Sequence, residues 1–286
     1  MNEGESEQFG VRLIDTGQWY LIVEVSENGM EAILKNVEAD TIPCILLFRK
    51  QWTNEGENLL EEVEREVYNN PRILDDYATH IVITSSKNLW IPADFTEDEE
   101  FNEVFFTSVY PASPDDIGSD FGNEEVNLYT LVPGLNSFLK RTLPGSKITS
   151  HMTIIKGKLD EIEIEKIGDK LPDTALQNFY INIRKNFVDI FAYENGRFIF
   201  GATHPYISST DILYKILLGA KAYGLIPSEA SVCLIGNDTQ LSSVNRLFRK
   251  FFKQVLNISV PKILNNENTS FAVSLIAGAE FEIEII

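Results

Sequence analysis

The residues Asp15, Thr16 and Gly17 form the first stretch of the chain whose types and spacing could do chemistry. Two Asp-Thr-Gly loops together can hold a pair of carboxylates that share one proton, as acid proteolysis requires. One Asp-x-Gly loop after a strand can lie under nucleotide phosphates, because glycine lets the backbone approach them. The chain has a single Asp-Thr-Gly, so we set proteolysis aside. A phosphate loop and an ordinary turn stay open, and we favour the turn.

Other side chains that carry chemistry are scattered. The three histidines, His80, His151 and His204, occur singly, and a zinc site needs clustered ligands, so we predict no metal and assign no catalytic residue. Ser85-Ser86 and Ser208-Ser209 lack a nucleophile elbow and are typical of a turn and a helix cap. The acidic runs at 61–64 and 97–100 are typical of solvated helix faces.

The charge of the chain is uneven. Its formal net charge is −19, with 28 acidic against 10 basic residues in 1–150 and 15 against 14 in 151–286. Such a field repels phosphate backbones and anionic lipid, so we predict neither nucleic acid nor a membrane surface as partner. The basic, aromatic segment 245–254 does not change this, because we expect Phe248, Phe251 and Phe252 to form the stripe and border of a helix.

Composition predicts a cytoplasmic protein with one or two domains. The chain has 286 residues, 44% of them apolar, and its first ten residues are acidic rather than basic and apolar. No apolar run reaches 18 residues, so we expect no membrane insertion. Cys44 and Cys233 lie in apolar runs and are expected to be buried thiols, with a disulfide as the less favoured alternative.

Apolar alternation predicts an α/β chain. In the first half we expect strands at 10–16, 19–36 (folded at Asn28-Gly29), 80–86 and 88–95, and later at 126–132. Helices are expected at 55–70 with Leu59, Leu60, Val63 and Val67 on one face, at 96–106 and at 134–143. The Pro-, Gly- and Ser-rich stretch 108–123 is expected to be a loop.

The second half repeats this kind of order. Strands are expected at 178–204, with a hairpin at Asn195-Gly196, and at 231–237 and 258–260. Helices are expected at 208–225, capped by Ser208 to Thr210 and ended by Gly224, and at 240–257 with Val244, Leu247, Phe248, Phe251 and Val255 inward. Aligning the two Glu-Asn-Gly turns sets an offset of 167 residues, which lays 13–29 over 180–196 with matching apolar positions. We interpret this as a duplicated unit of three strands and a helix.

Two such halves resemble the actin-like ATPase superfamily. The segments 80–95, 126–140, 187–225 and 231–237 are similar to a bacterial family without assigned function that carries this ribonuclease H-like fold and is related in shape to pilus-assembly actin-like proteins. The resemblance implies two duplicated actin-like domains, 1–150 and 151–286, each with a mixed sheet flanked by helices. Its motifs are patterns of apolar and turn residues, so it implies the fold and says little about activity.

Some ligand positions carry over from that superfamily. The resemblance places Asp15, Thr16 and Gly17 under phosphates, with the aspartate on hydrated Mg²⁺. In the facing loop, Asn182 stands in place of the acid and Arg184 in place of the glycine. The adenosine loop would fall at Gly236-Asn237-Asp238, with a single glycine.

We therefore expect a degenerate, non-catalytic scaffold or partner-binding protein with no cofactor. The alternative is a nucleotide-binding protein or ATPase that binds ATP and Mg²⁺ through Asp15, Thr16, Gly17, Arg184, Gly236 and Asn237 in the interdomain cleft. A third possibility is an acidic module that associates with a basic partner. The sequence identifies no particular partner and no oligomeric state.

Overall fold

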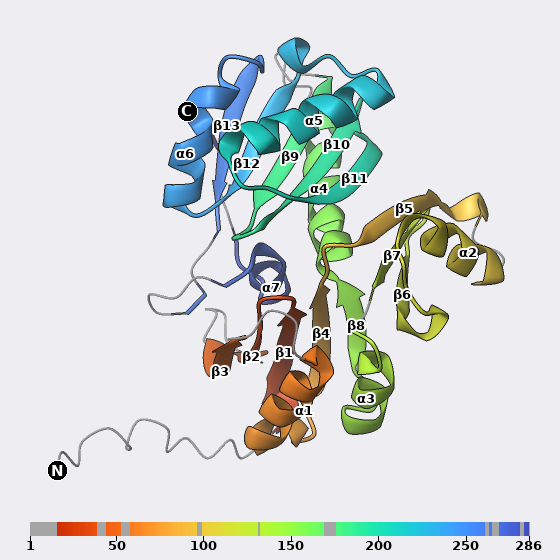
Figure 1. Ribbon diagram of the computed structural model, residues 1–286. Helices are drawn as coiled ribbons and strands as arrows, with labels where there is room; N and C mark the ends of the chain where they lie inside the picture. Colours follow the sequence, from red (N-terminus) through yellow and green to blue (C-terminus); the bar gives the residue numbers. More distant parts are fainter. Residues whose placement is uncertain are drawn as a thin grey trace.

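The computed structural model describes residues 16–38, 44–52, 58–95, 99–130, 132–168, 176–260, 263–264, 269–280 and 283–285. Two large sheets lie one above the other, with a smaller sheet beside them (Figure 1). The helices are α1 Leu59–Asn69, α2 Glu99–Val109, α3 Leu135–Thr142, α4 His151–Gly168, α5 Ser209–Tyr223, α6 Asp238–Phe248 and α7 Phe271–Ile276. None of the described helices is long and apolar enough to cross a membrane.

The first sheet has the strand order β3-β2-β1-β4-β8. Its strands are β1 Trp19–Ser26, β2 Gly29–Asn36, β3 Cys44–Gln51, β4 Ala78–Thr84 and β8 Lys147–Ser150. β1 pairs antiparallel with β2 and parallel with β4, so it lies at the centre of the sheet. The hairpin expected at Asn28-Gly29 is confirmed.

The second sheet has the strand order β11-β10-β9-β12-β13-β14. Its strands are β9 Gln177–Ile183, β10 Phe187–Glu194, β11 Arg197–Pro205, β12 Ser231–Gly236, β13 Gln254–Ser259 and β14 Ile283–Ile285. β9 pairs antiparallel with β10 and parallel with β12. Ser208 and Asp211 cap α5 reciprocally, and Gly224 ends it with φ of 74°, as the sequence predicts.

A third, three-stranded sheet projects to one side of the first (Figure 1). Its order is β5-β7-β6, with bounds β5 Asn88–Pro92, β6 Ile117–Phe121 and β7 Glu125–Thr130. Helix α2 buries Phe106 against Ile91, Val126 and Leu128 of this sheet. The expected loop at 108–123 is therefore wrong in part, because β6 lies within it.

Helices α4 and α7 fill the space between the two large sheets. One core cluster joins Ile22 and Val82 of the first sheet to Tyr180 of the second through Ile155 of α4 and Phe271 of α7. The outer faces are covered separately, by α1 and α3 on the first sheet and by α5 and α6 on the second. The molecule is thus layered as helices, sheet, central helices, sheet and helices.

The five strands of the first sheet correspond in order to β11-β10-β9-β12-β13 of the second, with β14 additional, though in a different register from the predicted one. Ser26 pairs with Gly29 at the β1–β2 turn, and the Arg184 amide donates to the Phe187 carbonyl across the β9–β10 turn. Ser26 therefore matches Arg184, an offset of 158 residues (184 − 26). The sequence-based offset of 167 is wrong, because it lays β1 over β10 although β1 takes the place of β9 in the strand order. Duplication of one ancestral unit stays a prediction, as do the domain bounds 1–150 and 151–286.

One further expectation is wrong, and another concerns residues that the structure does not describe. Helix α6 ends at Phe248, so Phe251 is no part of its inward stripe and is 40% exposed. Residues 10–15, where a first strand was expected, lie outside the described residues. Cys44 and Cys233 are thiols outside any disulfide, the first half-buried and the second buried.

Candidate functional site

A cavity of about 340 Å³ opens where the carboxyl ends of four strands meet. Ser26 at the end of β1 and Thr84 at the end of β4 line it from the first sheet. Asn182 near the end of β9 and Gly236 at the end of β12 line it from the second. Carboxyl ends of parallel strands are the usual ligand site in α/β folds, so the cavity is the candidate functional site.

Strand alternation explains why polar side chains face this cavity. In β9, Phe179 and Ile181 pack outward against the α5–α6 layer, so Tyr180 and Asn182 point to the inner face. In β10, Val188 and Ile190 point outward, which turns Asp189 inward. Cross-strand pairing then sets Asn182, Asp189 and Thr203 side by side in one row across β9, β10 and β11.

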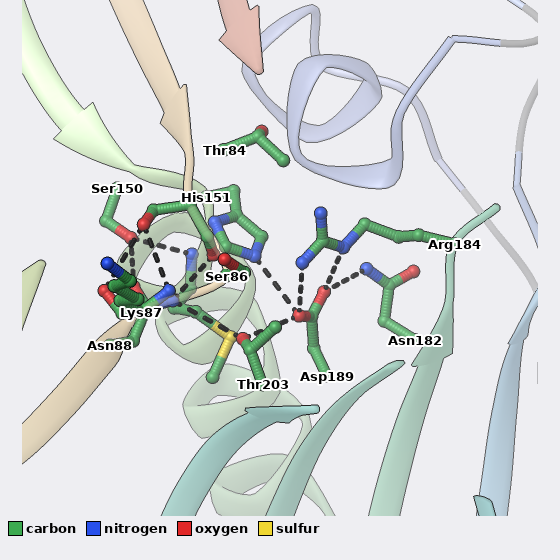
Figure 2. Close-up of polar contacts among 12 residues, drawn as sticks. Thr84, Ser86, Lys87, Asn88, Ser150, His151, Asn182, Arg184, Asp189 and Thr203 are labelled. Atoms are coloured by element: carbon green, nitrogen blue, oxygen red, sulfur yellow. Dashed lines mark hydrogen bonds and ion pairs between the residues drawn. The ribbon is translucent and has the colours of Figure 1, made fainter. Parts of the chain in front are cut away.

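Asp189 is the centre of a polar network (Figure 2), and its partners Asn182, Arg184 and His151 line the cavity. Its carboxylate is fully buried. Arg184 contacts both oxygens, with Nε 2.9 Å from Oδ2 and Nη2 2.9 Å from Oδ1. Asn182 Nδ2 donates to Oδ2 at 2.8 Å, and Thr203 Oγ1 donates to Oδ1 at 2.8 Å. The carboxylate is therefore held as an acceptor on both oxygens.

The charge state of Asp189 follows from these partners. Burial alone raises the pKa of its carboxyl group, because a charge is poorly solvated inside the protein. The positive charge of Arg184, then the electrostatic contribution of His151, and the hydrogen bonds from Arg184 outweigh burial and hold the pKa well below its usual range. Asp189 is thus an ionised structural partner and is not available as a general acid at neutral pH.

His151 is the first residue of α4 and packs against this pair. Its Nε2 lies 3.2 Å from Asp189 Oδ1, an ion-pair distance, and its Nδ1 lies 3.4 Å from the Ile83 carbonyl oxygen. A histidine beside an aspartate can activate a hydroxyl nucleophile through its second nitrogen. Here that nitrogen faces a backbone oxygen, so the Asp189–His151 pair does not form such a dyad.

The network continues from the second sheet into the first half of the chain. Thr203 Oγ1 lies 3.4 Å from Asn88 Nδ2, and Asn88 Oδ1 accepts from Ser150 Oγ at 3.1 Å. Ser150 ends β8 and directly precedes His151, so the start of α4 is held from both sides. A polar, buried network of this kind fixes how the two sheets sit around the cavity.

The opposite wall of the cavity carries a carboxylate. Glu24 matches Asn182 at the offset of 158 and accepts a hydrogen bond from Thr84 Oγ1 at 2.6 Å. Next to it, Glu31 matches Asp189, is 6% exposed, and is paired with Arg49 at 2.7 Å. Each half therefore has a buried acid paired with an arginine on its inner face, and Glu24 adds negative charge to the cavity.

The backbone of both cavity turns has ordinary geometry. None of the residues 27–29 and 184–187 has a positive φ. A backbone nest for phosphate needs right- and left-handed residues in succession, so neither turn forms one. Gly29 is required for another reason: a Cβ there would lie 2.2 Å from the Lys50 carbonyl oxygen of β3.

The structure brings together only part of the set of predicted ligand residues. Arg184, Gly236 and Asn237 line the cavity. Thr16 and Gly17 lie in a short 3₁₀ turn, Thr16–Gln18, before β1, at the end of that strand opposite Ser26. The eight residues of β1 span about 25 Å at about 3.3 Å each, so Thr16 and Gly17 are remote from the cavity. Asp15 lies outside the described residues.

Sequence reasoning missed Asp189, His151 and Glu24. Asp189 and Glu24 each interrupt an apolar strand, "FVDIFAY" and "LIVEVS", and a charged residue in such a run indicates a buried partner. His151 carries no comparable signal, because its role depends on α4 crossing between the sheets. Among the described residues no group of three Cys, His, Asp or Glu side chains could hold a metal ion.

Two sheets of one strand order around a central cleft define the class of protein. A Bacteroides thetaiotaomicron VPI-5482 protein, described as having an actin-like ATPase fold and unknown function, is similar to this chain with a TM-score of 0.71. The two are 19% identical over 93% of this chain and 97% of that one. The fold expected from the sequence, that of the actin-like ATPases, is confirmed.

The chain belongs to the family described as protein of unknown function (DUF3822), whose model matches residues 11–255. No curated protein matches it in sequence. It is also similar to the cytoplasmic domain of EpsL from the type II secretion system of Vibrio cholerae, at 11% identity, over 76% of this chain and 81% of that one, with a TM-score of 0.39. A PilM–PilN type IV pilus biogenesis complex is similar at 9% identity over 82% and 86%, with a TM-score of 0.45. We build no argument on these two weak likenesses.

Proposed function

We propose that this protein is a non-catalytic binding protein in which the cleft between the sheets is a fixed joint rather than a nucleotide site. The observation that carries the proposal is the pairing of Arg184 with Asp189. Arg184 and Lys185 both line the cavity, and the guanidinium of Arg184 is already bound, through its Nε and Nη2, to a carboxylate that is fully buried.

The energetic argument concerns what Arg184 would leave behind. Breaking a buried ion pair by removing one partner costs about 3–5 kcal/mol, because the other charge stays unpaired. A phosphate that drew Arg184 away would have to overcome that cost. Glu24 on the facing wall would repel the same phosphate, and the two turns lack the nest that could replace Arg184.

Nucleotide binding is the competing function, and one observation favours it. The cavity of about 340 Å³ lies within the range of about 300–1,000 Å³ typical of small-molecule sites. Arg184, directly after β9, and Asn237, between β12 and α6, both line it. Under this alternative, Arg184 would clamp a phosphate without leaving Asp189.

Thermal unfolding with and without ATP and Mg²⁺ separates the two functions. We expect no rise in Tm and no phosphate release. A nucleotide that bound would be detected, because ligand at about 100 times its Kd adds about 2.7 kcal/mol to the free energy of unfolding. A rise that disappears in Arg184→Ala, with each variant compared with its own ligand-free sample, would overturn the proposal. The matched control Arg197→Ala changes an exposed arginine on β11 and should keep any rise.

The term binding protein rests on a second surface, away from the cleft. Helix α2 leaves Phe101, Val104 and Phe105 exposed by 41%, 62% and 41%. A cluster of large apolar side chains on a surface is typical of a site for another protein. Action in the cytoplasm stays a prediction from composition.

A further inference from the structure

The α2 face is the exposed apolar surface of the small sheet. We define it as Phe95, Phe101, Val104, Phe105 and Val109, each at least 40% exposed. The ring of Phe101 stacks on Phe95 at 6.5 Å and on Phe105 at 5.7 Å between centroids, so the three rings form a row. Phe106 and Asn102 of the same helix point inward, and the face is therefore the outer side of α2.

The segment that carries this face has charge of one sign only. Residues 88–139, which hold β5, α2, β6 and β7, contain eleven Asp and Glu and no Lys, Arg or His. Asp94 and Glu100, both exposed, directly adjoin Phe95 and Phe101. An apolar and basic surface is complementary to this face, because opposite charges across a contact attract each other.

Such a surface occurs on the same chain, at the end of α6. Residues 239–266 contain five Lys and Arg and no Asp or Glu. We define the α6 end as Arg246, Arg249, Lys250, Phe251 and Lys253, all of which are exposed, with Phe251 at 40%. In the described part of the chain, no carboxylate forms an ion pair with its four cations.

The two surfaces cannot satisfy each other within one molecule. Helix α2 lies at the right-hand side of the molecule and α6 at the upper left, with the second large sheet between them (Figure 1). The contact must therefore join two copies. Because the two surfaces lie on different sides of the molecule, one neighbouring copy cannot bind both at once. The contact is therefore heterologous, and it adds copies head to tail instead of closing a two-fold dimer.

We propose that copies of this protein associate head to tail, with the α2 face of one copy bound to the α6 end of the next. This extends the proposed function, on which it rests, by naming the partner as a second copy. The chain has a net charge of −19, so copies repel at long range, and the contact depends on charges at short range. At about 0.15 M salt the screening length is about 8 Å, which leaves mainly those close charges.

Sedimentation velocity of the full chain, without nucleotide, tests the proposal. We expect a mean mass that rises with protein concentration at about 0.15 M salt and falls toward the monomer at about 1 M salt. Phe101→Ser with Phe105→Ser, and separately Arg249→Glu with Lys250→Glu, should each weaken association at least tenfold. The control Arg72→Glu with Arg197→Glu makes the same charge change at exposed sites elsewhere and should not.

Mixing the two defective variants distinguishes a head-to-tail contact from other association. Each variant keeps one intact surface, so the mixture should form a heterodimer that grows no further. A wild-type monomer at every concentration, association unaffected by either variant, or a mixture without heterodimer would each overturn the proposal. These outcomes leave the thermal test with ATP unaffected, so failure here is separate from failure of the proposed function.

Discussion

Arg184, which lines the cavity, lies side by side with Asp189, and two nitrogens of its guanidinium are each 2.9 Å from one oxygen of the carboxylate. The carboxylate is fully buried and the arginine side chain is 16% exposed. Arg184 and Asp189 belong to the β9–β10 hairpin of the second sheet, and His151 is the first residue of α4, which lies between the sheets. The contact of His151 with Asp189 therefore links the second sheet to α4.

Removing Arg184 should therefore destabilise the fold strongly. We expect Arg184→Ala to lower the free energy of unfolding by about 3–5 kcal/mol, because Asp189 would keep its charge without its main partner. Adding Asp189→Asn should recover part of the loss, and chemical denaturation of the two single variants and the double variant measures this coupling. Arg65→Ala, at a surface pair in which Arg65 is 53% exposed, should change the stability by about 0.5 kcal/mol or less. Equal losses for Arg184→Ala and Arg65→Ala would contradict the structural role.

Stability should fall as the pH is lowered from 6.5 toward 4, because of His80. Burial, and then the charge of Lys147, lower the pKa of His80 from 6.5 to about 4. The unfolded chain binds the proton first, so protonation favours unfolding by at most about 3 kcal/mol across this window. His204, whose pKa burial also lowers, adds to the fall. Denaturation at several pH values should show a shallower fall for His80→Gln, and an unchanged slope would refute this assignment.

A second acid transition should follow below about pH 4. The pKa of Asp189 in the folded protein lies well below that of the unfolded chain, about 3.9. The stabilisation that ionised Asp189 gives the folded protein is therefore fully present above about pH 3.9. It is lost as the pH falls from there toward the pKa of Asp189 in the folded protein. Asp189→Asn should be less stable than the wild type at neutral pH and should lose less below pH 4, which the same denaturation series measures.

Gly29 should be required for strand packing rather than for a ligand. In Gly29→Ala the new methyl group would meet the Lys50 carbonyl, so we expect a loss of about 3 kcal/mol. Gly157→Ala, on the exposed face of α4 with nothing within 4 Å, should gain about 0.5–1 kcal/mol. Thermal unfolding of both variants checks the opposite signs. A tolerated alanine at position 29 would argue against the close approach of β2 and β3.

Lys156 should hold the small sheet in place. Its ammonium group forms ion pairs with Glu125 of β7 and Asp160 of α4 and lies 4.8 Å from the Phe198 ring centroid. We expect Lys156→Met to cost about 2 kcal/mol, because both carboxylates are partly exposed and retain some solvation. Lys158→Met, two residues on and more exposed, should cost about 0.5 kcal/mol or less. Comparable losses for the two would show that Lys156 has no special role.

Local patterns predicted much of the fold. The Asn28-Gly29 hairpin, the Ser208 and Gly224 caps of α5 and the stripe of α1 all depend on residues close in sequence, so the pattern was sufficient. Helical periodicity does not predict α4, which with 18 residues is the longest of the described helices. This helix lies between two sheets and packs against both, so its apolar residues form no single stripe that periodicity could detect.

The site was less accessible to sequence reasoning than the fold. Arg184, Gly236 and Asn237 were placed in the cleft by resemblance, and the structure has them there. Asp15, Thr16 and Gly17 were assigned by their match to the Asp-x-Gly motif of the superfamily, and Thr16 and Gly17 lie at the other end of β1. The internal alignment relied on the tripeptide Glu-Asn-Gly, which occurs in two hairpins of this chain, and it matched the wrong pair. Strand order decides between such matches, and strand order is a property of pairing across the sheet.

The sequence by itself determined the α/β class, the acidic surface and most of the strands and helices, since each depends on composition or on short-range periodicity. Only the tertiary structure decided that Arg184 lies on Asp189, that His151 faces them, and that Thr16 and Gly17 lie at the far end of β1. These relations join residues from separate strands and helices. Their distances follow from how the two sheets and α4 pack, which no local pattern encodes.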